Sequence, residues 1–186
     1  MSDAATHDPK LIKAVIKEGG KKGVEIEGVS DMGGLSFFCT HVEVPAGDAE
    51  LLRMSMDAMN AQATPGDEER KGCSGHVGKM ILSDGVEALA ILAYVPDELK
   101  EKVNAKEWLQ SVLDAVTGGE ALADNTEQLA CGIVKADKEA GKFPLKDRDV
   151  AQRASIAFLR AKDVFPAEKD DSSSDFILGD DELGDL

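Results

Sequence analysis

Apolar and polar residues follow their most regular pattern along the chain between residues 78 and 119. The first half of this stretch holds two apolar runs joined by Asp84-Gly85, a dipeptide that accepts positive φ and is typical of a hairpin turn. In the second run, 88–95, both alternating sets of side chains are mostly apolar, so we expect a central strand covered on both faces. Pro96 lacks an amide hydrogen and is predicted to end that strand.

Helical spacing replaces the alternation in the second half of this stretch. Asn104 is predicted to cap a helix, and Glu107 stands three residues later, as in a capping box. The helix carries one apolar stripe, formed by Trp108, Val112 and Ala115 with Leu109 and Val116 beside them. Gly118-Gly119 is predicted to end it.

Similar patterns predict the remaining elements. Asp8-Pro9 begins a short amphipathic helix that Gly19-Gly20 ends, and Asp48 caps a second helix reaching about residue 63. Further strands are predicted at residues 24–26, 35–44 and 128–134, and a last helix at 147–162. We therefore expect an α/β (α+β) fold class, with a single domain in which helices flank a mixed β-sheet.

Composition divides the chain into three parts: a basic N-terminal helix or arm at 1–22, an α/β domain at 23–166, and an acidic tail at 167–186. The tail sets Phe176, Ile177 and Leu178 among acids and serines, a pattern that often folds on a partner. We take these three residues as candidate partner-binding anchors.

Net charge is −15 over 186 residues, which argues against autonomous binding to phosphate backbones. The sequence has no apolar run long enough to span a bilayer and no apolar signal core at its start, so we expect no membrane association. Its 3 cysteines are scattered and suggest no disulfide scaffold. The cytoplasm is the expected compartment.

A basic cluster on the first helix contrasts with this acidity. Lys10, Lys13 and Lys17 occupy the side opposite the apolar stripe, and Lys21 and Lys22 follow. These lysines are either an ordinary solvated face or a docking arm for an acidic partner. Lys10, Lys13 and Lys17 are accordingly candidate partner-binding residues, and the chain's own acidic tail is a competing ligand for them.

Candidate chemistry is sparse. Cys39, His41, Cys73 and His76 supply ligand types that zinc uses, but their spacing is not that of a finger or ribbon, and packing explains them as well. The glycines around Gly78-Lys79 precede a strand, whereas a phosphate-binding loop opens a helix. No nucleophile elbow or zinc-protease motif occurs. We expect a non-enzyme with no cofactor and no metal.

The stretch from Gly78 to Gly119 resembles the C-terminal accessory domain of alanyl-tRNA synthetases, the C-Ala or DHHA1-type domain. The matching elements are Gly78-Lys79 opening a strand, the strand ending at Val95-Pro96, the run from Val103 to Trp108, and Gly118-Gly119. The likeness extends loosely over most of residues 24–165. It implies a small α/β module that contacts tRNA and mediates protein association.

The sequence departs from that family after the Trp108 helix, where a Gly-rich segment carrying lysine is expected. Here the residues are acidic (Glu120, Asp124 and Glu127), and no Lys or Arg lies between Lys106 and Lys135. Acids at this point would repel phosphate. We therefore predict a non-catalytic protein-binding subunit or adaptor of a larger assembly. The alternative is a tRNA-binding or trans-acting factor related to alanyl-tRNA synthetase.

The chain also resembles small accessory proteins of the ciliary axoneme, particularly of its central apparatus. The likeness lies in its size, its acidic composition rich in Ala and Gly, and its repurposed C-Ala-like module. It implies a cytoskeletal setting in a cilium or flagellum for the predicted adaptor.

Overall fold

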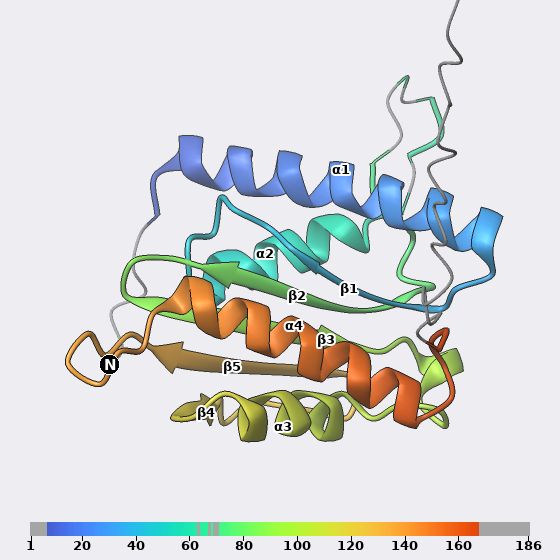
Figure 1. Cartoon of the computed structure of the whole chain (residues 1–186). Helices are drawn as coiled ribbons and strands as arrows, with labels where there is room; N and C mark the ends of the chain where they lie inside the picture. Colours follow the sequence, from blue (N-terminus) through green and yellow to red (C-terminus); the bar gives the residue numbers. More distant parts are fainter. Residues whose placement is uncertain (1–6, 63, 67, 69–70, 168–186) are drawn as a thin grey trace, which may run out of the picture.

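One mixed sheet organises the protein, and helices cover both of its faces (Figure 1). The computed structural model describes residues 7–62, 64–66, 68 and 71–167. Within these residues the 5-stranded sheet has the order β1-β2-β3-β5-β4. The β1 strand runs parallel to β2, while the other neighbours are antiparallel. This architecture confirms the predicted fold class.

The elements follow one another along the chain, and the longest connection, residues 60–77, joins α2 to β2. Their bounds are α1 Pro9–Gly33, β1 Phe37–His41, α2 Ala49–Met59, β2 Gly78–Asp84, β3 Ala88–Tyr94, a 3₁₀ turn Asp97–Leu99, α3 Ala105–Ala115, β4 Gly119–Ala121, β5 Leu129–Lys135 and α4 Pro144–Ala161.

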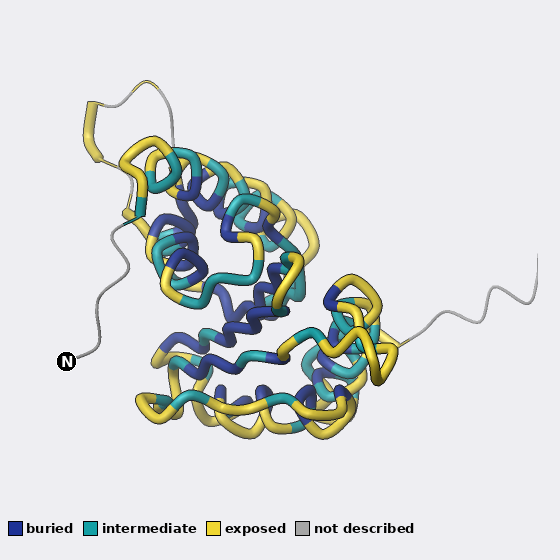
Figure 2. Tube along the Cα trace, turned by 90° about the vertical axis from the view of Figure 1, so that its left-hand side faces the viewer, coloured by how far each residue is buried: buried dark blue, intermediate teal, exposed yellow. Residues whose placement is uncertain are grey.

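The helices form two layers, α1 with α2 on one side of the sheet and α3 with α4 on the other (Figure 1). Each layer encloses its own apolar cluster: Trp108 and Phe37 belong to the α3/α4 side, and Leu52 and Met59 to the α2 side. Residues 89–93 of β3 are fully buried, so the prediction of a central strand covered on both faces is confirmed. Figure 2 shows the buried residues gathered at the sheet and at the facing sides of the helices.

Local chemistry explains where several elements begin. The side chain of Asp48 accepts hydrogen bonds from the amides of Glu50 and Leu51, and Asn104 does the same for Lys106 and Glu107. Both N-caps are as predicted. The carboxylate of Glu107 accepts a hydrogen bond from Lys162 and does not complete the capping box. The hairpin of β2 and β3 is confirmed as well.

The first helix is much longer than the sequence pattern predicted. Gly19-Gly20 does not end it, and the strand predicted at 24–26 is part of the same helix. A Cβ atom on Gly19 would lie 2.5 Å from the carbonyl oxygen of Ser55, and one on Gly23 would lie 2.7 Å from that of Met59. These glycines let α1 approach the α2 backbone closely, so they serve packing and do not terminate the helix. The predicted domain boundary at residue 22 falls inside α1.

The turn between β2 and β3 also differs from its prediction. Gly85 does not adopt a positive φ angle. A Cβ atom there would collide with the carbonyl oxygen of Ala46 in the neighbouring turn. Gly85 is therefore required by a close backbone approach between two loops.

Other bounds differ by smaller amounts, and one short strand was missed. The strand predicted at 35–44 is β1 over five residues, the helix predicted to reach residue 63 ends at Met59, and the last helix starts at Pro144. The β4 strand, which pairs with β5, has only three residues, too few for a pattern of alternation.

Candidate functional site

The structure does not assemble the cysteine and histidine residues into a metal site. Cys39 and His41 lie on β1, whereas Cys73 and His76 lie in the loop before β2. Cys73 is buried and His76 is exposed. Among the described residues, no group of three His, Cys, Asp or Glu side chains could hold a metal ion.

A buried lysine that sequence reasoning missed lies at the start of β2. Lys79 is fully buried; its Nζ donates to the carbonyl oxygen of Val77 at 2.9 Å and lies 4.8 Å from the centroid of the Tyr94 ring. Burial lowers the pKa of Lys79, and the nearby Cys73 opposes that shift. The Tyr94 hydroxyl donates to the carbonyl oxygen of Gly75 at 2.9 Å. These contacts tie the loop before β2 to the sheet.

Because the amine of Lys79 already has an acceptor and an aromatic face as neighbours, we assign it a structural role. In the sequence, Lys79 is marked only as a single lysine at the start of an apolar strand. In the structure it lies directly opposite Tyr94 in the ladder between β2 and β3. Only the pairing of β2 with β3 shows that these two side chains meet.

The lysines of α1 form a straight, exposed row. Lys10, Lys13, Lys17 and Lys21 recur at intervals of three and four residues, which places them on one face of the helix. We call these four residues the lysine stripe. At a rise of about 1.5 Å per residue the stripe is roughly 16 Å long. All four are exposed, and none has an ion-pair partner within the described part of the chain.

The opposite face of α1 explains this orientation. Val15, Gly19 and Ile26 are buried, so the lysine side of the helix faces outward. Sequence reasoning placed Lys21 beyond the end of the helix, and the uninterrupted α1 adds it to the stripe. Lys22 points elsewhere and pairs with Glu25 at 3.5 Å.

Acidic residues are scarce around the stripe. Between Pro9 and Val24 the only carboxylate on α1 is Glu18. Its two oxygens accept hydrogen bonds from the backbone amides of Glu43 and Val44, at 2.8 and 3.0 Å. Glu18 is thus occupied in fastening α1 to the chain that leaves β1, and within the described part of the chain it forms no ion pair with a lysine of the stripe.

A groove runs between α1 and β1, which is an edge strand of the sheet. Its hollow of about 220 Å³ is lined by Ile26, Val29, Lys22 and Glu25 of α1 and by Phe38, Cys39 and Thr40 of β1. We call this hollow the α1/β1 groove. Val29 is 46% exposed although it is apolar.

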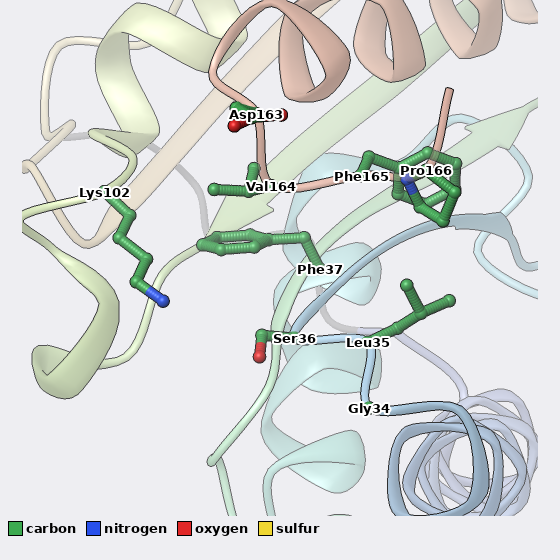
Figure 3. Close-up of a pocket in the computed structure, with 9 residues that line it drawn as sticks. All are labelled: Gly34, Leu35, Ser36, Phe37, Lys102, Asp163, Val164, Phe165 and Pro166. Atoms are coloured by element: carbon green, nitrogen blue, oxygen red, sulfur yellow. The ribbon is translucent and has the colours of Figure 1, made fainter. Parts of the chain in front are cut away.

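A second hollow of about 370 Å³ lies at the beginning of β1. Figure 3 shows Val164, Phe165 and Pro166 on one side of it and Leu35 to Phe37 on the other. The end of the described chain therefore lies beside the start of the edge strand.

Comparison with models of protein families and with curated proteins finds no match. Among solved structures, the protein is similar to the C-Ala domain of alanyl-tRNA synthetase from Aquifex aeolicus, with 22% identity and a TM-score of 0.39. The match covers 65% of this chain and 90% of that chain.

Several predictions stay predictions. Phe176, Ile177 and Leu178 lie outside the described residues, as does the tail beyond Ala167. In the described part of the chain no helix is long and apolar enough to cross a membrane. The cytoplasmic and ciliary settings stay predictions from the sequence.

Proposed function

We propose that this protein is a non-catalytic binding module and that the lysine stripe of α1 docks an acidic segment of a protein partner. The observation that carries this proposal is a row of four exposed lysines without ion-pair partners among the described residues, on a chain of net charge −15. Charge of one sign gathered on one face raises the local concentration of ligands of opposite charge.

An ordinary solvated helix face would mix acids with its lysines at spacings of three and four residues. Between Lys10 and Lys21 the only carboxylate is Glu18, which is bound to backbone amides. Glu25, four residues after Lys21, pairs with Lys22. This arrangement favours an external anion as the ligand of the stripe.

A short acidic segment fits the stripe better than a long nucleic acid does. The C-terminal half of α1 carries Glu25, Glu27 and Asp31, so an extended polyanion lying along the helix would leave the lysines and meet acids. A segment of a few acidic residues matches the length of roughly 16 Å. The alternative function, a tRNA-binding factor related to alanyl-tRNA synthetase, would use the same lysines.

Fluorescence anisotropy with two labelled probes, a short glutamate-rich peptide and bulk tRNA, tests the proposal. The variant Lys10→Glu/Lys13→Glu/Lys17→Glu is compared with Lys106→Glu/Lys135→Glu/Lys138→Glu, which changes net charge equally at exposed lysines elsewhere. We expect the full chain to bind the peptide and the stripe variant to bind it about tenfold or more weakly, since each exposed pair contributes about 0.2–1 kcal/mol and reversal adds repulsion. The control variant should bind almost as the unaltered chain does.

Equal losses in both variants would show that only net charge matters and would refute the stripe as the site. Sub-micromolar, salt-sensitive binding of tRNA without binding of the peptide would establish the alternative instead. Circular dichroism of each variant verifies that α1 remains folded.

A further inference from the structure

The outer edge of β1 presents backbone groups that the sheet does not use. The amide of Val42 donates to Leu82, and the carbonyl oxygen of Ser36 accepts from Gly78, so these even-numbered positions face β2. Backbone groups alternate sides along a strand, and those of Phe37, Cys39 and His41 therefore point away from the sheet. Such an edge is a template for an added strand.

The α1/β1 groove lies beside this edge and is large enough for one or two side chains of a bound peptide segment. At about 220 Å³ it is smaller than the 300–1,000 Å³ of typical small-molecule sites. Its apolar lining by Ile26, Val29 and Phe38 suits one or two large apolar side chains. An extended segment paired with the edge of β1 would place alternate side chains in this pocket.

The described chain ends next to this edge. Val164, Phe165 and Pro166 line the hollow at the beginning of β1, and the sequence continues to residue 186. Phe176 follows Pro166 by ten residues, a length that spans up to about 33 Å when extended. The five residues of β1 span only about 17 Å, so the tail reaches the whole edge.

We propose that the chain's own tail segment Phe176-Ile177-Leu178, which lies outside the described residues, docks in the α1/β1 groove by adding a strand to the edge of β1. Because the tail starts at the N-terminal end of β1, the added strand would run parallel to it. The acids Asp180 and Asp181 then follow toward the part of α1 that carries Lys22. In this orientation the apolar side chains of the tail segment meet the apolar lining of the groove.

The chain's own tail has an advantage over a separate partner at this site. A short flexible tether gives its segment an effective concentration of the order of 1 mM. Even a segment with a dissociation constant of about 0.1 mM would then occupy the groove most of the time. The groove and the lysine stripe lie on different sides of α1, so this inference does not depend on the function proposed above.

Hydrogen exchange of the full chain, followed by NMR, tests the proposal residue by residue. The outward amides of Cys39 and His41 should exchange about tenfold more slowly in the unaltered chain than in the variant Phe176→Asp/Leu178→Asp. The amides of Phe38 and Thr40, which face β2, are the internal reference and should not change.

Two matched controls separate docking from general effects. Leu183→Asp/Leu186→Asp adds the same charge to the same tail and should preserve the protection. On the groove side, Val29→Asp should abolish the protection, and combining it with the Phe176→Asp/Leu178→Asp change should add nothing. Met32→Asp lies on the same helix, is not part of the groove lining and is 87% exposed in the unaltered chain, so it should leave the protection intact.

Equal exchange of Cys39 and His41 in the unaltered chain and in the Phe176→Asp/Leu178→Asp variant would overturn the proposal. Protection that grows with protein concentration would overturn it too, because a second copy would then be the occupant. These outcomes do not depend on any acidic peptide, so they are independent of the lysine-stripe experiment.

Discussion

Trp108 donates its indole N–H to the hydroxyl of Ser155 at 3.0 Å, and both side chains are fully buried. This bond joins α3 to α4 across the core. Phe37 of β1 meets the same indole edge to face, with ring centroids 6.0 Å apart and an interplanar angle of 80°. One side chain therefore connects two helices and the edge strand of the sheet.

Trp108→Ala should destabilise the fold by about 3–5 kcal/mol, since it removes a large buried ring and leaves a cavity. Ser155→Ala should cost about 1–3 kcal/mol, because the buried indole N–H would lose its acceptor. Urea unfolding of both variants measures these losses. An unchanged midpoint for Trp108→Ala would contradict the packing described for α3.

Replacing the glycines of α1 by alanine should have opposite effects at different positions. Gly19→Ala and Gly23→Ala should destabilise the protein, because the added methyl group would lie only 2.5–2.8 Å from backbone atoms of neighbouring segments of the same chain. Gly28→Ala is the matched control: its Cβ would meet nothing within 4 Å, so it should stabilise by about 0.4–1 kcal/mol. Thermal unfolding distinguishes these outcomes, and a stabilised Gly19→Ala variant would contradict the close approach of α1 to α2.

The buried Lys79 should make stability depend on pH in the alkaline range. Its pKa is lowered from 10.5 by burial, so the unfolded chain holds this proton at pH values where the folded chain has released it. Stability therefore rises as pH increases from the lowered pKa toward about 10.5. Lys79→Met should remove this rise, whereas Lys106→Met, at an exposed position, should keep it.

Denaturant titrations at a series of pH values from about 7 to 10.5 test this prediction, because 10.5 is the ordinary pKa from which burial lowers that of Lys79. The informative quantity is the difference in unfolding free energy between Lys79→Met and the unaltered chain. A difference that does not vary with pH would show that the amine keeps its ordinary affinity for protons.

Cys39 and Cys131 should resist alkylation. Burial raises the pKa of each thiol from 9.0 to about 11. At pH 8 the reactive thiolate is then about 100-fold scarcer than in an ordinary cysteine. Mass spectrometry of iodoacetamide-treated protein should show slow modification at both positions, with rates that still increase above pH 9 and with rapid modification in urea. A plateau near pH 9 would contradict the raised pKa values.

The sequence predicted those parts of the fold that short-range chemistry determines. Asp48 and Asn104 cap their helices through their own side chains, and the apolar alternation of β3 reflects burial on both faces. These features depend on residues within a few positions of one another, so a single sequence contains them.

The parts that were missed depend on contacts between distant segments. The glycines of α1 and the glycine of the hairpin turn were interpreted by local conformation, but their reason is the backbone of another segment. The stripe was predicted in part: Lys10, Lys13 and Lys17 were recognised, and Lys21 joined them only when α1 proved continuous. The α1/β1 groove could not be predicted, since it requires the position of a helix relative to a strand far from it.

The glycines of α1, among them the two that allow it to approach α2, also weaken α1 as an independent helix. Gly19, Gly20, Gly23 and Gly28 each cost about 1 kcal/mol relative to alanine in a helix interior. Away from α2 this segment would be mostly unwound, and its lysines would no longer stand in a row. The basic surface is therefore created by tertiary docking and vanishes when that docking is lost. A ligand that recognises the row would bind only the assembled state, and it would raise the protein's melting temperature in proportion to the logarithm of its concentration.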